Sequence, residues 1–181
     1  MNRIIEVNSR ADIFEKYLDT PIEKLLGYHN LDYPLPKTDD AEMLIGMCMD
    51  NRNHLRIPEN FAYIIRSGGA NLRHSEFKVS YSIAVGGIRH IALLAHNNCG
   101  MVNLKSKEEN FIKGLIENAG WDPEFAESHF IHFSPLFEIG NEFDFVLSEA
   151  NRLRERYPRV IVAPLYYEVE TNRLHQLIEN H

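Results

Sequence analysis

Short apolar stretches that alternate with longer amphipathic segments constrain the fold of this 181-residue chain most strongly. Each apolar stretch has the length of a buried strand, and the segments between them repeat apolar residues with a helical period. Strands are expected at residues 43–47, 61–65, 90–95 and 160–163, with a short last one near 173–177, and helices at 75–85, 106–120 and 143–157. Alternating strands and helices are typical of α/β domains. The sequence therefore predicts a single α/β domain with a central, mostly parallel β-sheet flanked by helices.

The segment before the first strand is predicted to form an N-terminal helical arm. Ser9 has the side chain of a helix N-cap, and apolar residues follow it as far as Leu18. Pro34 and Pro36 then end any helix and favour an extended connection. We therefore divide the chain into an arm, residues 1–36, and an α/β domain, residues 37–181. Because a small domain beyond the prolines offers this helix few partners, we expect it to pack on a second subunit.

Composition excludes several classes of function. The net charge of −7 leaves no excess of Lys and Arg to neutralise phosphates, so nucleic acid is not an expected partner. The apolar stretches are too short to cross a bilayer, and the N-terminus lacks the apolar core of a signal peptide. A cytoplasmic location with no membrane partner is the default expectation. Thiols stay reduced there, so Cys48 and Cys99 are interpreted as a metal-binding or catalytic pair rather than a disulfide.

Polar residues stand at the ends of three neighbouring strands of the predicted sheet. Cys48 closes the first strand, Arg66 the second and His96 the third. Ligands of open α/β sheets gather at the carboxyl ends of the strands. The sequence therefore predicts a functional site at this edge.

Two short motifs indicate what the site binds. His96 and Cys99 are three residues apart in a turn, and Cys48 completes a set of two thiols and one imidazole, which suits zinc. With no third cysteine in the chain, the fourth ligand is left open between water, another histidine and a carboxylate such as Asp50. Taken singly, these residues are typical of a buried hydrophobic cysteine, a core histidine and, for Asp50 and Arg52, an ion pair bracing a loop. Their combination favours a metal site.

The same residues resemble the β-class carbonic anhydrases. The resemblance lies in Cys-Met-Asp-Asn-Arg at 48–52, Arg-Ser-Gly-Gly-Ala-Asn at 66–71, His-Asn-Asn-Cys-Gly at 96–100 and the ending APLYYEVETNRLHQL at 163–177. Departures from the usual family pattern are Ser67-Gly68-Gly69 after the arginine and Asn98 between the second and third ligands. The only glutamine is Gln176, so the chain is more similar to the short microbial branch of the family.

The resemblance implies reversible hydration of carbon dioxide to bicarbonate by an enzyme with one Zn²⁺ per chain. It further implies that Cys48, His96 and Cys99 bind the zinc and that Asp50 and Arg52 form the polar dyad beside it. The backbone N–H of Gly100 would help hold carbon dioxide or bicarbonate. A homodimer or a dimer of dimers, with the site near a subunit interface, is also implied.

Two other functions remain open at this point. A carbon disulfide or carbonyl sulfide hydrolase of the same family would have identical zinc ligands. A zinc-binding protein without catalysis is the second alternative, although such a role does not require the Asp50–Arg52 dyad.

Overall fold

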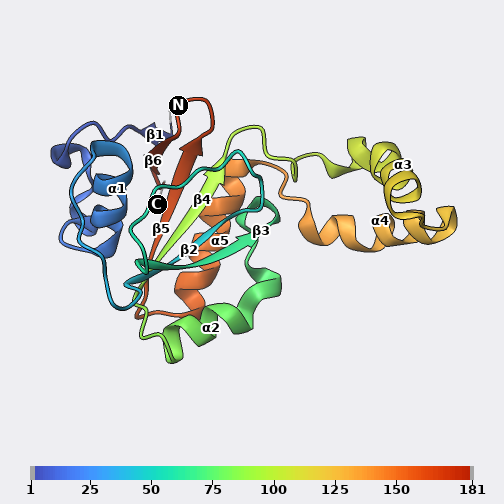
Figure 1. Ribbon diagram of the computed structural model, residues 1–181. Helices are drawn as coiled ribbons and strands as arrows, with labels where there is room; N and C mark the ends of the chain where they lie inside the picture. Colours follow the sequence, from blue (N-terminus) through green and yellow to red (C-terminus); the bar gives the residue numbers. More distant parts are fainter. Residues whose placement is uncertain (1–2, 180–181) are drawn as a thin grey trace.

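A six-stranded sheet lies at the centre of the molecule, and the computed structural model describes residues 3–179 (Figure 1). The strands are β1 (Ile4–Ile5), β2 (Met43–Cys48), β3 (Ala62–Ser67), β4 (His90–His96), β5 (Ile161–Glu168) and β6 (Arg173–Leu177). Their order in space is β1-β6-β5-β4-β2-β3. Neighbouring strands β3, β2, β4 and β5 run parallel. β6 pairs antiparallel with β5, and β1 pairs antiparallel with β6 at the edge. The predicted mostly parallel α/β sheet is confirmed.

Helices cover both faces of this sheet. The five α-helices are α1 (Pro21–Leu31), α2 (Glu76–Ala84), α3 (Glu108–Ala119), α4 (Pro123–Phe137) and α5 (Glu142–Arg156). Successive residues of β2 point to opposite faces, so Ile45 packs in the core beside α1 whereas Leu44 packs in the core beside α5. Both faces of β2 are buried, as expected for a central parallel strand. No helix within residues 3–179 is long and apolar enough to span a membrane.

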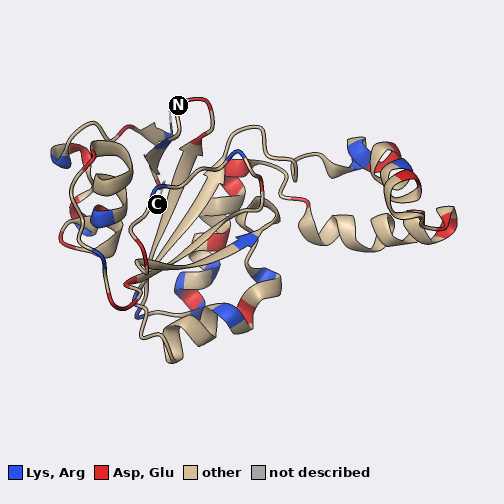
Figure 2. Ribbon diagram, in the orientation of Figure 1, with Lys and Arg blue, Asp and Glu red and all other residues tan. Residues whose placement is uncertain are grey.

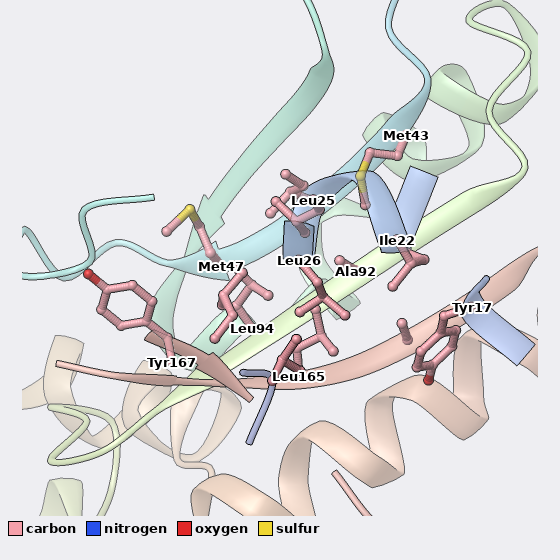
Figure 3. Close-up of a cluster of buried hydrophobic side chains, with 14 of the residues drawn as sticks. Tyr17, Ile22, Leu25, Leu26, Met43, Met47, Ala92, Leu94, Leu165 and Tyr167 are labelled. Atoms are coloured by element: carbon pink, nitrogen blue, oxygen red, sulfur yellow. The ribbon is translucent and has the colours of Figure 1, made fainter. Parts of the chain in front are cut away.

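The first helix packs on the sheet of its own chain. Leu25 and Leu26 are fully buried in a core cluster with Met43, Ala92 and Leu165 of the sheet (Figure 3). We expected a second subunit against this helix on the premise that it lacks partners within the chain. That premise is wrong. Its apolar face is already covered by three strands of the same domain.

This helix also begins later than expected. Ser9 precedes only a 3₁₀ turn (Arg10–Asp12), which the Asp12 carboxylate closes by accepting a hydrogen bond from the Ser9 N–H at 2.8 Å. The α-helix starts after Thr20, whose hydroxyl oxygen accepts a hydrogen bond from the Ile22 N–H at 3.1 Å. Both residues are good N-caps, so the presence of an N-cap residue does not by itself fix where the helix begins.

A pair of helices, α3 and α4, projects from the sheet as a hairpin (Figure 1). The sequence analysis did not predict α4, although a start signal was present. The Asp122 carboxylate accepts hydrogen bonds from the N–H groups of Glu124 at 3.0 Å and Phe125 at 3.1 Å, which is typical of an N-cap. Within these two helices, which are described in full, only Ala126 and Phe130 are buried. The hairpin therefore has almost no core of its own.

Candidate metal centre

Two parallel strands end side by side and carry two of the three expected ligands. Cys48 is the last residue of β2, and His96 is the last residue of β4. Because Met47 pairs with Leu94, the two strand ends lie almost level at the carboxyl edge of the sheet. Cys99 follows in the turn after β4. The potential ligand atoms of Cys48, His96 and Cys99 all lie within 4.8 Å of one another, and all three residues are buried.

The backbone of two loops brings the two thiols together. Asn98 has a left-handed φ of 54°, which an asparagine adopts more readily than most residues, and it turns the chain before Cys99. Gly69, after β3, has a φ of 60°, and its N–H donates to Cys48 Sγ at 3.4 Å. A Cβ at Gly69 would approach Ile139 Cγ2 to 2.7 Å, so the absence of a side chain here allows Ile139 to pack closely against the loop. The two Sγ atoms lie 3.9 Å apart.

His96 presents an unused nitrogen to this cluster. Its Nδ1 lies 2.9 Å from the carbonyl oxygen of Asn97, which orients the ring. Its Nε2 is buried and has no hydrogen-bond partner among the described residues. A buried nitrogen without a partner is costly, and coordination to a metal would satisfy it. Two thiolates and one imidazole are donors that Zn²⁺ favours. The three residues therefore fit a metal ion.

The electrostatics of the metal-free cluster favour one thiolate. The hydrogen bond from Cys99 lowers the pKa of the Cys48 thiol to about 4, although burial acts in the opposite direction. The same hydrogen bond, together with burial, raises the pKa of Cys99. Burial disfavours the charged imidazolium of His96, but the nearby Cys48 sulfur outweighs this and raises the pKa of His96. A cation binding here would find one sulfur already deprotonated and would displace the second proton.

Asp50 and Arg52 form an ion pair beside the cluster. Arg52 Nη2 donates to Asp50 Oδ2 at 2.7 Å, and Nε donates to Oδ1 at 3.0 Å. These hydrogen bonds lower the pKa of Asp50 to about 2, although partial burial opposes them. The sequence left open whether Asp50 is a metal ligand. In the structure its carboxylate faces Arg52 and is not part of the three-residue cluster.

Arg66, expected at the site because it lies near the end of β3, has a different position. Its Nη1 donates to the carbonyl oxygen of Cys48 at 3.1 Å, and its Nη2 donates to that of Asn53 at 3.2 Å. Arg66 therefore holds the loop that carries Cys48 and the dyad. Its guanidinium donates hydrogen bonds to backbone carbonyl oxygens.

The sequence analysis anticipated neither Glu142 and Ile139 nor the surroundings of Gly100. Glu142, at the start of α5, accepts a hydrogen bond from the Cys99 N–H at 3.3 Å. Gly100, whose N–H the family resemblance implicates, lines a cavity of about 500 Å³, and its carbonyl accepts a hydrogen bond from Lys107. Ile139 packs against both cysteines and shields them from water. Glu142 lies 43 residues beyond Cys99, so no local pattern could have pointed to it.

No protein-family model matches this chain, and no curated protein matches it by sequence. Solved structures with the same fold do match. A carbonic anhydrase from Glaciozyma antarctica is 23% identical with a TM-score of 0.60, and the match covers 80% of this chain and 85% of that chain. β-Carbonic anhydrase isoform I from Trichomonas vaginalis is 17% identical with a TM-score of 0.65, covering 93% of this chain and 100% of that chain.

The apo form of a carbon disulfide hydrolase is also similar, at 20% identity and a TM-score of 0.55, covering 92% of this chain and 93% of that chain. All three similarities extend over most of both chains. The chain therefore has the fold of the β-carbonic anhydrases, which confirms, at the level of the fold, the resemblance carried by its sequence motifs.

Proposed function

We propose that the protein is a zinc enzyme that interconverts carbon dioxide and bicarbonate. The observation that carries the proposal is the cluster of Cys48, His96 and Cys99 directly beside the ion pair of Asp50 and Arg52. A structural zinc site closes its shell with four protein ligands, whereas a catalytic one has three and an open place. Within residues 3–179, three such ligand atoms gather here.

The chain supplies groups that would position the reactants. One Zn²⁺ bound by the three residues would act as a Lewis acid and provide a hydroxide nucleophile at neutral pH. Asp50, kept ionised by Arg52, can accept a hydrogen bond from the O–H of the nucleophile and so direct its lone pair at the carbon of carbon dioxide. The N–H of Gly100 is proposed to donate to an oxygen of the substrate or of bicarbonate. The apolar side chains of Ile139 and Met101 keep the cluster dry, which strengthens each of these polar interactions.

Hydrolysis of carbon disulfide or carbonyl sulfide is the second candidate. The cavity beside the site is bounded mainly by apolar side chains, including Met49 and Met101, and would admit an apolar sulfur compound as well as carbon dioxide. The similarity to a carbon disulfide hydrolase supports the same candidate. A zinc protein without catalysis is less well supported. The Asp50 carboxylate lies beside the three ligands and is not one of them, so zinc binding alone would not explain its position.

A direct assay distinguishes these functions. Zinc-loaded protein is mixed with carbon dioxide in a stopped-flow instrument with a pH indicator, and with carbon disulfide or carbonyl sulfide while sulfide release is followed. We expect rapid proton release with carbon dioxide and none above background with Cys48→Ser. Sulfide release without carbon dioxide hydration would favour the second candidate. Fully zinc-loaded protein that is inactive with all three substrates would refute both enzymatic proposals.

We also propose a homodimer or a dimer of dimers. α4 carries charged residues only toward its N-terminal end (Figure 2), and several large apolar side chains are exposed along it. Ile131 is 58% exposed and Leu136 is 44% exposed on this projecting helix. Large apolar side chains exposed together on one projecting helix indicate an interaction site, and we propose that a second copy of the chain covers it. The free, buried thiols of Cys48 and Cys99 suit a reducing compartment, so we propose the cytoplasm as the location.

A further inference from the structure

A cavity of about 500 Å³ lies between the base of the α3–α4 hairpin and the loops of the candidate metal centre. Gly68 and Gly100 bound it on the side of the metal centre, and α3 and α4 bound it on the other. This volume is typical of pockets for small organic molecules and far exceeds the needs of a three-atom substrate. The cavity therefore has room for a ligand that the proposed reaction does not use.

The wall formed by the hairpin is aromatic. One face of α4 carries three phenylalanines at helical spacing, Phe130, Phe133 and Phe137. Phe111 of α3 packs against them, with its ring centroid 5.1 Å from that of Phe130. Met101 closes the wall toward the metal centre. Such a surface favours a flat ring or an aliphatic body, because aromatic rings pack well edge-to-face and offset-stacked.

One cation stands at the end of the cavity next to Gly100. Lys107 Nζ donates to the carbonyl oxygens of Gly100 and, at 3.1 Å, of Val102. An ammonium group has three donors, so these two hydrogen bonds leave one for a ligand. The neighbouring carboxylate of Glu138 accepts hydrogen bonds from the N–H groups of Asn103, Leu104 and Gly140, which hold it at the hairpin base.

Aromatic walls with one ammonium at the end fit an amphiphilic anion. We propose that this cavity binds an organic monocarboxylate with an aromatic ring, its carboxylate on Lys107 and its ring against the phenylalanines of α4. Ile131 and Leu136, which we assign to a subunit contact, are not among the residues that line the cavity. The proposal goes beyond the proposed function, and it holds for the chain with or without zinc.

The only tryptophan of the chain provides a readout. The Trp121 ring lies 5.0 Å, between centroids, from His129, which lines the cavity. Benzoate is titrated into the full-length protein while Trp121 fluorescence is followed, once with zinc and once after removal of metal. Benzamide has the ring without the charge, and acetate has the charge without the ring. We expect saturable binding of benzoate in both forms of the protein, and binding of benzamide and acetate that is weaker by roughly tenfold or more.

Variants separate the two parts of the ligand. Lys107→Met should weaken benzoate binding roughly tenfold and leave benzamide binding unchanged, whereas Phe133→Ala should weaken both. Lys113→Met, on the part of α3 away from the cavity, is the matched control and should bind benzoate like the wild type. The proposal is overturned if the wild type shows no saturable response to benzoate. It is equally overturned if Lys107→Met binds benzoate as tightly as the wild type. The same holds if this variant weakens benzamide binding as much as it weakens benzoate binding.

Discussion

Arg52 Nη2 donates a hydrogen bond to the backbone carbonyl oxygen of Asn98 at 2.9 Å. The two residues belong to different motifs, 46 positions apart, and the contact joins the loop after β2 to the turn after β4. The same guanidinium holds the Asp50 carboxylate. Arg52 thus fixes both the carboxylate beside the metal centre and the turn that delivers Cys99.

Loss of this bridge should therefore damage the site without unfolding the domain. We expect Arg52→Ala to lower kcat/KM for carbon dioxide by roughly 10–100-fold, the usual effect of removing a residue that orients a metal site. Stopped-flow assays on zinc-loaded protein measure this. The control is Arg56→Ala, whose guanidinium pairs with exposed Asp32 away from the cluster. Wild-type activity in Arg52→Ala would mean that the dyad only braces the loop.

The three-residue cluster predicts one zinc per chain. Cys48→Ser removes one of two thiolates from a set of only three ligands, so we expect it to lose most of the bound metal. Elemental analysis of purified protein should give about one equivalent for the wild type. Met49→Ser is the matched control, because this neighbouring side chain is 65% exposed and should not affect the metal content. One equivalent of zinc in Cys48→Ser would contradict the ligand assignment.

The burial of α1 predicts a stability effect within a single chain. Leu25→Ala removes a fully buried side chain from the core beside the sheet and should reduce the free energy of unfolding by about 2–5 kcal/mol. Lys24→Ala, one residue earlier, removes only an exposed ion pair with Glu42 and should cost less than about 1 kcal/mol. Urea unfolding of both variants provides the comparison. Equal stability losses would mean that the core does not include this helix in solution.

Glu138 should make stability dependent on pH. Burial raises the pKa of this carboxyl, but hydrogen bonds from the N–H groups of Gly140, Leu104 and Asn103, with the charge of Lys107, outweigh it and lower the pKa below its ordinary value. Between the ordinary pKa of about 4.3 and the lowered one, the unfolded chain binds more protons than the folded chain, so stability falls as the pH falls. The stabilisation is fully present above about pH 5.

This dependence can be measured with urea midpoints from about pH 3 to pH 7, a range that spans the titration of carboxyl groups. Glu138→Gln keeps a hydrogen-bond acceptor but cannot be protonated. Its midpoint should be lower than that of the wild type at pH 7, and the difference should shrink as the pH falls below 4.3. A difference that stays constant over the whole range would exclude the ionised carboxylate as the cause.

The exposed face of α4 predicts how the chain assembles. A charge placed there should oppose burial against a second copy, so Ile131→Glu with Leu136→Glu is expected to shift the protein toward monomer in sedimentation velocity. Val85→Glu, directly after α2, is the control, since this side chain is 68% exposed but lies away from the hairpin. A double variant that remains fully oligomeric would place the interface elsewhere.

Much of the fold could be predicted because its signals are local. The strands around residues 43–47 and 90–95 are apolar over the length of a buried strand, and parallel strands necessarily bring their carboxyl ends to one edge. The sequence alone therefore predicts that Cys48 and His96 lie close together. Cys99 must lie near them as well, because it is only three residues after His96. The sequence by itself thus determined the α/β architecture and the three residues that the fold assembles.

Other features depended on where side chains point after the elements have packed. Arg66 lies near the end of β3, close to the predicted site. In the packed structure its side chain hydrogen-bonds to the carbonyl oxygens of Cys48 and Asn53. The first helix found its partners in the sheet, because its apolar face fits the core between strands that are distant in the sequence. Glu142 reaches Cys99 only because α5 starts beside the turn. These contacts join residues far apart along the chain, so only the tertiary structure decided them.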